Sequence, residues 1–189
     1  MSNSPLVIGV TGHARHGKGE VAKVLVEEYG YTEMQFSGQL KAMALKLAPW
    51  VEAHGAPRNE VLDLRHVVER DGWDMAKQNP EVRRILQVLG TECVRDMLGQ
   101  DSWVTALDLA WVGTKPIVIS DVRFPNEVEF VKAHGVLIRV ERPGFENGVD
   151  PQHPSEKIVQ TLLADHRISN DGTLEDLRLA VRSYMLQFE

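Results

Sequence analysis

Cysteine is almost absent from this sequence, since Cys93 is its one thiol. A single cysteine excludes a disulfide within the chain and fits a reducing compartment. No run comes near the ~20 apolar residues that a membrane span needs. The first residues also lack the basic region and the long apolar run of a signal peptide. We therefore expect a cytoplasmic protein that stays where it is made and enters no membrane.

Basic residues are in the minority, because 21 Lys and Arg stand against 27 Asp and Glu and leave a net charge of −6. A protein that coats a nucleic-acid polymer needs a basic face, so we expect no such partner, although a focused pocket can still bind phosphate. The 43% hydrophobic and 25% charged residues exclude a disordered tail, a collagen-like repeat and a small disulfide scaffold. A length of 189 residues favours one domain.

Short apolar runs alternate with stretches of helical periodicity along the chain. Strands are predicted at 6–10, 34–36, 117–119, 136–140 and 167–169. Helices are predicted at 21–29, 40–47, around 60–70, 80–98, 102–111, 126–134, 154–165 and from 173 onward. Strands that alternate with helices predict an α/β fold, in which helices cover both faces of a parallel sheet.

A glycine-rich segment between the first strand and the first helix matches the phosphate-binding pattern GxxxxGK, from Gly12 to Lys18. Its backbone N–H groups and the helix N-terminus can hold phosphate oxygens, and Lys18 can reach the outer phosphates. The full motif continues with Ser or Thr, whose hydroxyl binds Mg²⁺, but Gly19 and Glu20 follow here. An accidental glycine-rich turn is the alternative, which the strand, lysine and helix together disfavour.

Polar residues share one face of the helix predicted at 80–98. Arg84, Gln87, Thr91 and Arg95 are spaced 3, 4 and 4 apart. At about 100° per residue they fall within roughly 80°. Guanidinium groups suit phosphate and an amide suits a base edge. A solvated face with Arg–Glu pairs is the alternative for a lone helix.

Asp121 lies at the carboxyl end of the buried strand 117–119, which ends at Ser120 and Asp121. Ligands of open α/β sheets bind at the carboxyl ends of strands, and a carboxylate there can hold Mg²⁺ directly or through water. Arg123, two residues on, can reach a phosphate. The alternative for Asp121 is that it only caps the next turn.

Longer segments carry a resemblance to one known family. In order they are GHARHGKGEVAKVL, FSGQLKAMA, RRILQVLGTECVRD, GQDSWV, ISDVRFPNEVEF, IRVERPG, HPSE and ISNDGTLEDL. The sequence resembles the bacteriophage deoxynucleoside monophosphate kinases, in the adenylate-kinase-like P-loop group, from Val7 to Leu177. The resemblance implies a three-layer α/β/α P-loop NTPase fold with a parallel sheet, a short lid and a helical acceptor-binding region. It also implies transfer of the ATP γ-phosphoryl to a deoxynucleoside monophosphate for DNA precursor supply, in the host cytoplasm if a phage encodes the chain.

The resemblance further implies a role for individual residues on the donor side. ATP is expected to contact Gly12, His13, Ala14, Arg15, His16, Gly17, Lys18, Gly19, Glu20, Asn170 and Asp171. The expected catalytic residues are Lys18, Asp121, Arg123 and Arg142, with Mg²⁺ as the cofactor at Asp121. His13, His16 and His153 could bind phosphate, and the alternative that the sequence favours for each is an ordinary loop histidine.

The acceptor nucleotide is expected to contact a second set, which comprises Ser37, Lys41, Arg84, Gln87, Thr91, Arg95, Trp103 and Arg123. Trp103 or Trp73 could stack on its base. The whole chain, 1–189, is predicted as one kinase domain. Its core is expected at about 5–48, 113–141 and 165–189, and its acceptor-binding region at about 49–112. A lid at about 142–157, flanked by Arg139 and Arg142, is expected to exclude water.

Two other functions stay open at this point. One is a dephospho-coenzyme A kinase, which shares the fold and a similar Asn-Asp-Gly segment. The other is a nucleotide-binding module without catalysis, which the missing hydroxyl after Lys18 favours and the candidate phosphate-binding arginines oppose. The sequence leaves open which base is accepted, whether deoxyribose or ribose is preferred, and whether the chain forms a homodimer.

Overall fold

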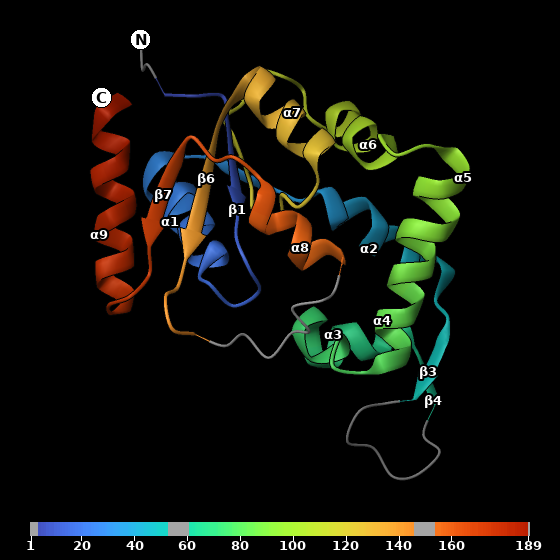
Figure 1. The fold of residues 1–189 in the computed structure, drawn as a ribbon. Coiled ribbons are helices and arrows are strands. Elements are labelled where there is room, and N and C mark those ends of the chain that lie inside the picture. The colour runs from blue at the N-terminus through green and yellow to red at the C-terminus, as the bar shows by residue number, and fades with distance from the viewer. Residues whose placement is uncertain (1–3, 53–60, 146–153, 189) are drawn as a thin grey trace. The chain divides into compact units, whose positions relative to one another are not determined.

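The computed structural model describes residues 4–52, 61–145 and 154–188, with the backbone alone for 154–156 (Figure 1). The chain divides into two compact units. One runs up to Phe36 and resumes at Leu107, and the other is Ser37–Ala106.

A parallel five-stranded sheet forms the centre of the first unit. Its strand order is β2 (Thr32–Met34), β5 (Ile117–Ile119), β1 (Val7–Thr11), β6 (Gly135–Glu141) and β7 (His166–Ser169). Each strand pairs in parallel with its neighbours in this order. Parallel strands need crossover connections, and strands buried on both faces are mostly apolar, as β1 and β5 are.

Helices cover both faces of this sheet. On one face, Ile8, Val10 and Ile138 pack against α1 (Lys18–Tyr29) and α9 (Leu174–Met185). On the other face, Gly9 lies directly beside Val131 of α7 (Pro125–His134). Figure 1 shows α1 and α9 together and α7 apart from them. The predicted three-layer α/β/α fold is confirmed.

The second unit is mostly helical and has its own small core. It contains a hairpin of β3 (Trp50–Glu52) and β4 (Val61–Asp63), then α3 (Leu64–Ala76), α4 (Pro80–Gln87), the π-helical segment η1 (Val88–Arg95) and α5 (Asp96–Leu98). The buried residues Ala44, Val51, Leu64, Val67, Ala76 and Val82 form the core. Two further helices, α2 (Phe36–Leu47) and α6 (Ser102–Ala110), extend across the unit boundaries.

Several predicted boundaries are wrong. The helix expected around 60–70 starts only at Leu64, because Val61–Asp63 pair with β3 and the Asp63 carboxylate caps α3. The strand expected at 34–36 is β2, two residues earlier, since α2 already begins at Phe36. The helix expected at 154–165 is α8 (Pro154–Thr161). In the described parts of the chain, no helix is long and apolar enough to cross a membrane.

Candidate active site

The phosphate loop leaves β1 at Thr11, whose buried hydroxyl donates to the Val122 carbonyl over 2.9 Å. Gly12 has φ 139°, and a Cβ there would lie 2.3 Å from the Val140 backbone oxygen, so only glycine fits. Lys18 Nζ donates to the carbonyls of Gly12 (2.8 Å) and His13 (2.7 Å). The loop is thus folded tightly around the lysine, as a phosphate-binding loop requires.

The loop enters α1 through Gly17, which has φ 104° and ψ 10°. The Asn170 side chain closes this end of the loop, because its Nδ2 donates to the His16 carbonyl over 2.9 Å. Asn170 is itself held by its backbone N–H, which donates to the Glu141 carbonyl. Asn170, expected to contact ATP, therefore also fixes the loop's shape, while the neighbouring Asp171 is exposed.

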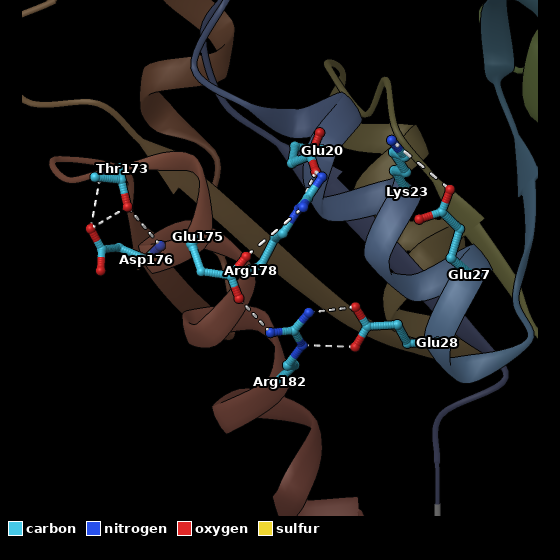
Figure 2. Close-up of polar contacts among 9 residues, drawn as sticks. All are labelled: Glu20, Lys23, Glu27, Glu28, Thr173, Glu175, Asp176, Arg178 and Arg182. Atoms are coloured by element: carbon cyan, nitrogen blue, oxygen red, sulfur yellow. Dashed lines mark hydrogen bonds and ion pairs between the residues drawn. The ribbon is translucent and has the colours of Figure 1, made fainter.

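Glu20, two residues after Lys18 in the first turn of α1, is engaged with α9 (Figure 2). Its Oε1 accepts from Nε of Arg178 over 2.7 Å and lies 2.7 Å from the second guanidinium nitrogen. The hydrogen bond to Glu20 raises the pKa of Arg178. Further ion pairs link Arg178 to Glu175, and Arg182 to Glu175 and Glu28. Glu20 thus belongs to a ladder that joins α1 to α9, whereas Gly19 is exposed.

The carboxyl end of β5 lies beside this loop, because β5 pairs with β1 and the Val122 N–H donates to Val10 O. Asp121 Oδ1 accepts from the N–H of Phe36 over 2.9 Å, so it caps α2. The buried Glu127 carboxylate accepts from the N–H groups of Arg123 (2.7 Å) and Phe124 (3.1 Å). This turn places Arg123 half-buried, and the structure records no bond of its guanidinium to any described residue.

The two arginines that flank the expected lid have different surroundings. Arg142 is exposed, its guanidinium lies 4.4 Å from the centre of the Phe145 ring, and its N–H donates to Nδ1 of His16. Arg139 is buried and donates to the carbonyls of Val159 and Leu162 at the end of α8. Burial lowers the pKa of Arg139, against the attraction of Glu141. Residues 146–153 of the lid, with His153, lie outside the described residues.

In the second unit, the π-helical segment changes the expected face. Arg84, Gln87 and Thr91 are exposed, but Arg95 is buried and donates to the Gln100 carbonyl over 3.1 Å. A π-helix bonds i to i+5, so each turn holds more residues than the α-helical spacing assumes. Within this segment Cys93 is exposed, while Val94 is buried.

Other acceptor-side candidates lie on neighbouring helices of the same unit. Trp103 on α6 is 5% exposed, and its indole N–H donates to the Gly90 carbonyl of η1 over 3.0 Å. This geometry makes Trp103 a support for η1 and argues against its stacking on a base. Ser37 and Lys41 are half-buried on α2. Arg84 pairs with Glu81, and this hydrogen bond raises the pKa of Arg84.

A divalent cation would find the Asp121 carboxylate at the end of β5. Among the described residues no group of three or more His, Cys, Asp or Glu side chains could hold a metal ion. Mg²⁺ usually binds through one or two carboxylates together with substrate phosphates and waters, so Asp121 fits this ion better than a protein cage would.

Some contacts that shape the site were missed by the sequence reasoning. Glu127 accepts from the N–H of Arg123 and so fixes the turn after β5. Arg178 binds Glu20 of α1, and Thr11 joins β1 to the segment after β5. The DVRFPNE segment carried a signal for Glu127. For Arg178 there was none, because it lies 158 positions from Glu20.

The comparisons with known proteins identify the family of the chain. The family described as "Deoxynucleotide monophosphate kinase" matches residues 61–181. A protein of Acanthamoeba polyphaga mimivirus, provisionally named a deoxynucleotide monophosphate kinase, is 28% identical over 90% of this chain and 91% of its own. The deoxynucleoside-5'-monophosphate kinase of Escherichia phage T5 is 30% identical over 54% of this chain.

The chain spans about half the length of the phage relatives, 44% for the T5 protein and 48% for the deoxynucleotide monophosphate kinase of Enterobacteria phage T4. A solved structure of dephospho-CoA kinase from Campylobacter jejuni aligns with a TM-score of 0.49 and 15% identity, over 96% of each chain. The family match covers well over half of the sequence. The chain belongs to the deoxynucleotide monophosphate kinase family, whose members are phosphotransferases.

Proposed function

We propose that this chain transfers the γ-phosphoryl group of ATP to a deoxynucleoside monophosphate, which yields a deoxynucleoside diphosphate and ADP. The observation that carries the proposal is the phosphate loop around Lys18, next to the Asp121 carboxylate, in a chain of this family. An acceptor phosphate oxygen forms the new bond to the γ-phosphorus, and the β–γ bridging oxygen leaves with ADP. Such transfer depends mostly on positioning and on charge neutralisation.

The donor side of the proposal uses residues of the first unit. Backbone N–H groups of the phosphate loop and Lys18 hold the ATP phosphates, at the positive end of α1. Arg123 and Arg142 neutralise charge on the transferred group. Two observations support Arg123. Its guanidinium has no hydrogen bond or ion pair with any described residue, and its backbone N–H is held by Glu127. No general base is needed in this scheme.

The proposed metal is Mg²⁺, with Asp121 as its protein ligand, directly or through water. When bound, Mg²⁺ would neutralise phosphate charge and orient the phosphates of ATP. What weighs against Glu20 as the ligand is its ion pair with the Arg178 guanidinium. The loop itself offers no hydroxyl after Lys18.

The acceptor side of the proposal uses the second unit. Arg84, Gln87 and Thr91 are exposed on consecutive turns of α4 and η1. Ser37 and Lys41 of α2 and the buried Arg95 complete the proposed acceptor set. Trp103 supports η1 instead of touching the nucleotide, given its hydrogen bond to Gly90.

A coupled assay that measures ADP release tests the proposal. The full chain is incubated with ATP and Mg²⁺ and with each deoxynucleoside monophosphate, each ribonucleoside monophosphate and dephospho-coenzyme A. We expect turnover with at least one deoxynucleoside monophosphate, and loss of turnover in Lys18→Ala with the fold retained by circular dichroism. Turnover with dephospho-coenzyme A alone, or ATP binding without any turnover, would contradict it. A Lys18→Ala enzyme within tenfold of the wild-type kcat would overturn the assignment of the phosphate loop.

A further inference from the structure

His16 is a buried side chain in the middle of the phosphate loop. It is 8% exposed, whereas its neighbour Arg15 is exposed. Its ring makes edge-on contacts with two other rings, at 5.3 Å from that of His13 and 6.3 Å from that of Phe145 between ring centres. A loop residue whose task is only to give its N–H to phosphate needs no such side chain.

The imidazole of His16 bonds to the backbone just beyond β6. Nδ1 accepts from the Arg142 N–H over 3.1 Å, which places the ring proton of the neutral form on Nε2. The His16 carbonyl accepts from Asn170 at the end of β7. The His16 side chain therefore binds the residue after β6, and the His16 backbone binds the residue after β7.

The partner of this bond is one of the proposed catalytic arginines. Arg142 has its backbone N–H bonded to His16, and its guanidinium lies on the face of Phe145. Phe145 in turn contacts the His16 ring, so the three residues form a closed triangle. In this arrangement the backbone of Arg142 is set by the loop that holds the ATP phosphates.

We propose that His16 is a positioning residue that acts through Arg142: its Nδ1 fixes Arg142 to the donor loop, so that one loop places both Lys18 and the Arg142 guanidinium. This inference rests on the proposed function for its kinetic consequence, but the bond itself is testable without activity. The acceptor at Nδ1 is the essential feature, not the charge or the size of the ring.

Three variants of His16 separate the acceptor position from the ring. In His16→Asn the amide oxygen can take the place of Nδ1, in His16→Gln it lies one atom further out, and His16→Ala has no acceptor. Amide hydrogen exchange at Arg142, measured by NMR on the full chain, reports the bond directly. We expect protection in the wild type and in His16→Asn, and exchange about tenfold faster or more in the other two variants. Equal exchange in all four proteins would overturn the bond.

A double-mutant cycle tests whether His16 acts through Arg142. We expect His16→Ala and His16→Gln to lower kcat about tenfold while the KM for ATP changes little, and His16→Asn to restore most of kcat. Because Arg142→Ala removes the group being positioned, adding His16→Ala to it should cause little further loss. Additive losses, or equal rescue by Asn and Gln, would overturn the role.

The two proposals fail in different ways. A wild-type chain without turnover on every acceptor would remove the proposed function, and the hydrogen-exchange result would still decide the bond. An active wild type with unchanged kcat in His16→Ala would remove the positioning role and leave the proposed function intact.

Discussion

Two carboxylates near the phosphate loop, Asp121 and Glu20, have different partners, and this difference predicts which one serves the metal. Asp121→Asn keeps an oxygen that can cap the Phe36 N–H but loses the charge. We expect kcat to fall about a hundredfold or more, because charge neutralisation supplies most of the rate. High Mg²⁺ or Mn²⁺ should restore part of it.

Glu20→Gln is the matched control for that experiment. Its partner Arg178 belongs to α9, so we expect a smaller change in kcat and in the Mg²⁺ dependence than for Asp121→Asn. Kinetics across a Mg²⁺ titration compare the two variants. A larger and more metal-dependent defect in Glu20→Gln would transfer the metal site to Glu20.

Gly12 and Gly19 lie seven positions apart in the same motif but face different surroundings. A Cβ at Gly12 would meet the Val140 backbone oxygen at 2.3 Å, at φ 139°, whereas one at Gly19 meets nothing within 4 Å. We expect Gly12→Ala to lower the free energy of unfolding by about 1–3 kcal/mol. Gly19→Ala, in the first turn of α1, should leave it unchanged or raise it by up to ~1 kcal/mol. Urea denaturation measures both, and equal values would contradict the clash expected at Val140.

At the scale of elements, the junction of α4 and η1 predicts a difference between two arginines. Arg84 is exposed, so Arg84→Ala should raise the KM for the monophosphate by roughly thirtyfold, with little change in the KM for ATP or in stability. Arg95 is buried, so Arg95→Ala should also lower the melting temperature. Steady-state kinetics and thermal unfolding measure these effects.

The Glu81 carboxylate provides the control for Arg84. Because it binds the Arg84 guanidinium at 2.7 and 2.8 Å, Glu81→Gln should release this arginine without removing it. The KM for the monophosphate should then stay the same or fall. If Arg84→Ala changes the KM for ATP alone, the acceptor assignment is wrong.

The N-terminus of α3 predicts a dependence of stability on pH. Burial would raise the pKa of Asp63, but hydrogen bonds from Arg65 and His66 outweigh it and lower the pKa from 3.8 to about 2. The stabilisation is therefore present above the unfolded-state pKa and is lost as the pH falls toward about 2. Asp63→Asn keeps a capping oxygen without the titration, so its unfolding free energy should decline less steeply below about pH 4. Denaturation curves across this range compare the two, and parallel curves would contradict the assignment.

At the scale of the molecule, the features that could be predicted from the sequence are those that residues close together in the chain determine. The phosphate loop follows from glycines and a lysine between a buried strand and a helix. The start of α4 follows from Asn79 and Pro80, and the Asn79 side chain indeed accepts from the Glu81 N–H. The parallel sheet follows from the alternation of apolar runs with helical periods. These signals are local, so each could be interpreted without knowing the rest of the fold.

Features that depend on distant contacts could not be predicted in this way. The hairpin pairs two strands of three residues each, too short for a clear alternation of side chains. The π-helical segment shifts Arg95 into the interior, where the pattern had placed it on a polar face. In the same way, no local pattern in the sequence indicates that the indole N–H of Trp103 donates to the Gly90 carbonyl.

The strand order also has a consequence for synthesis on the ribosome. β1 lies in the middle of the sheet and is made first, yet its partners for Val7 are Ile117 of β5 and Gly135 of β6, more than a hundred residues later. All of Ser37–Ala106 is translated in between, and its contacts are local by comparison. Because β1 pairs with β5 and β6, Val7–Thr11 cannot take its place in the sheet until these later strands have been translated. Until then the five residues of β1, all of them buried in the finished sheet, lack both of the strands that pair with them.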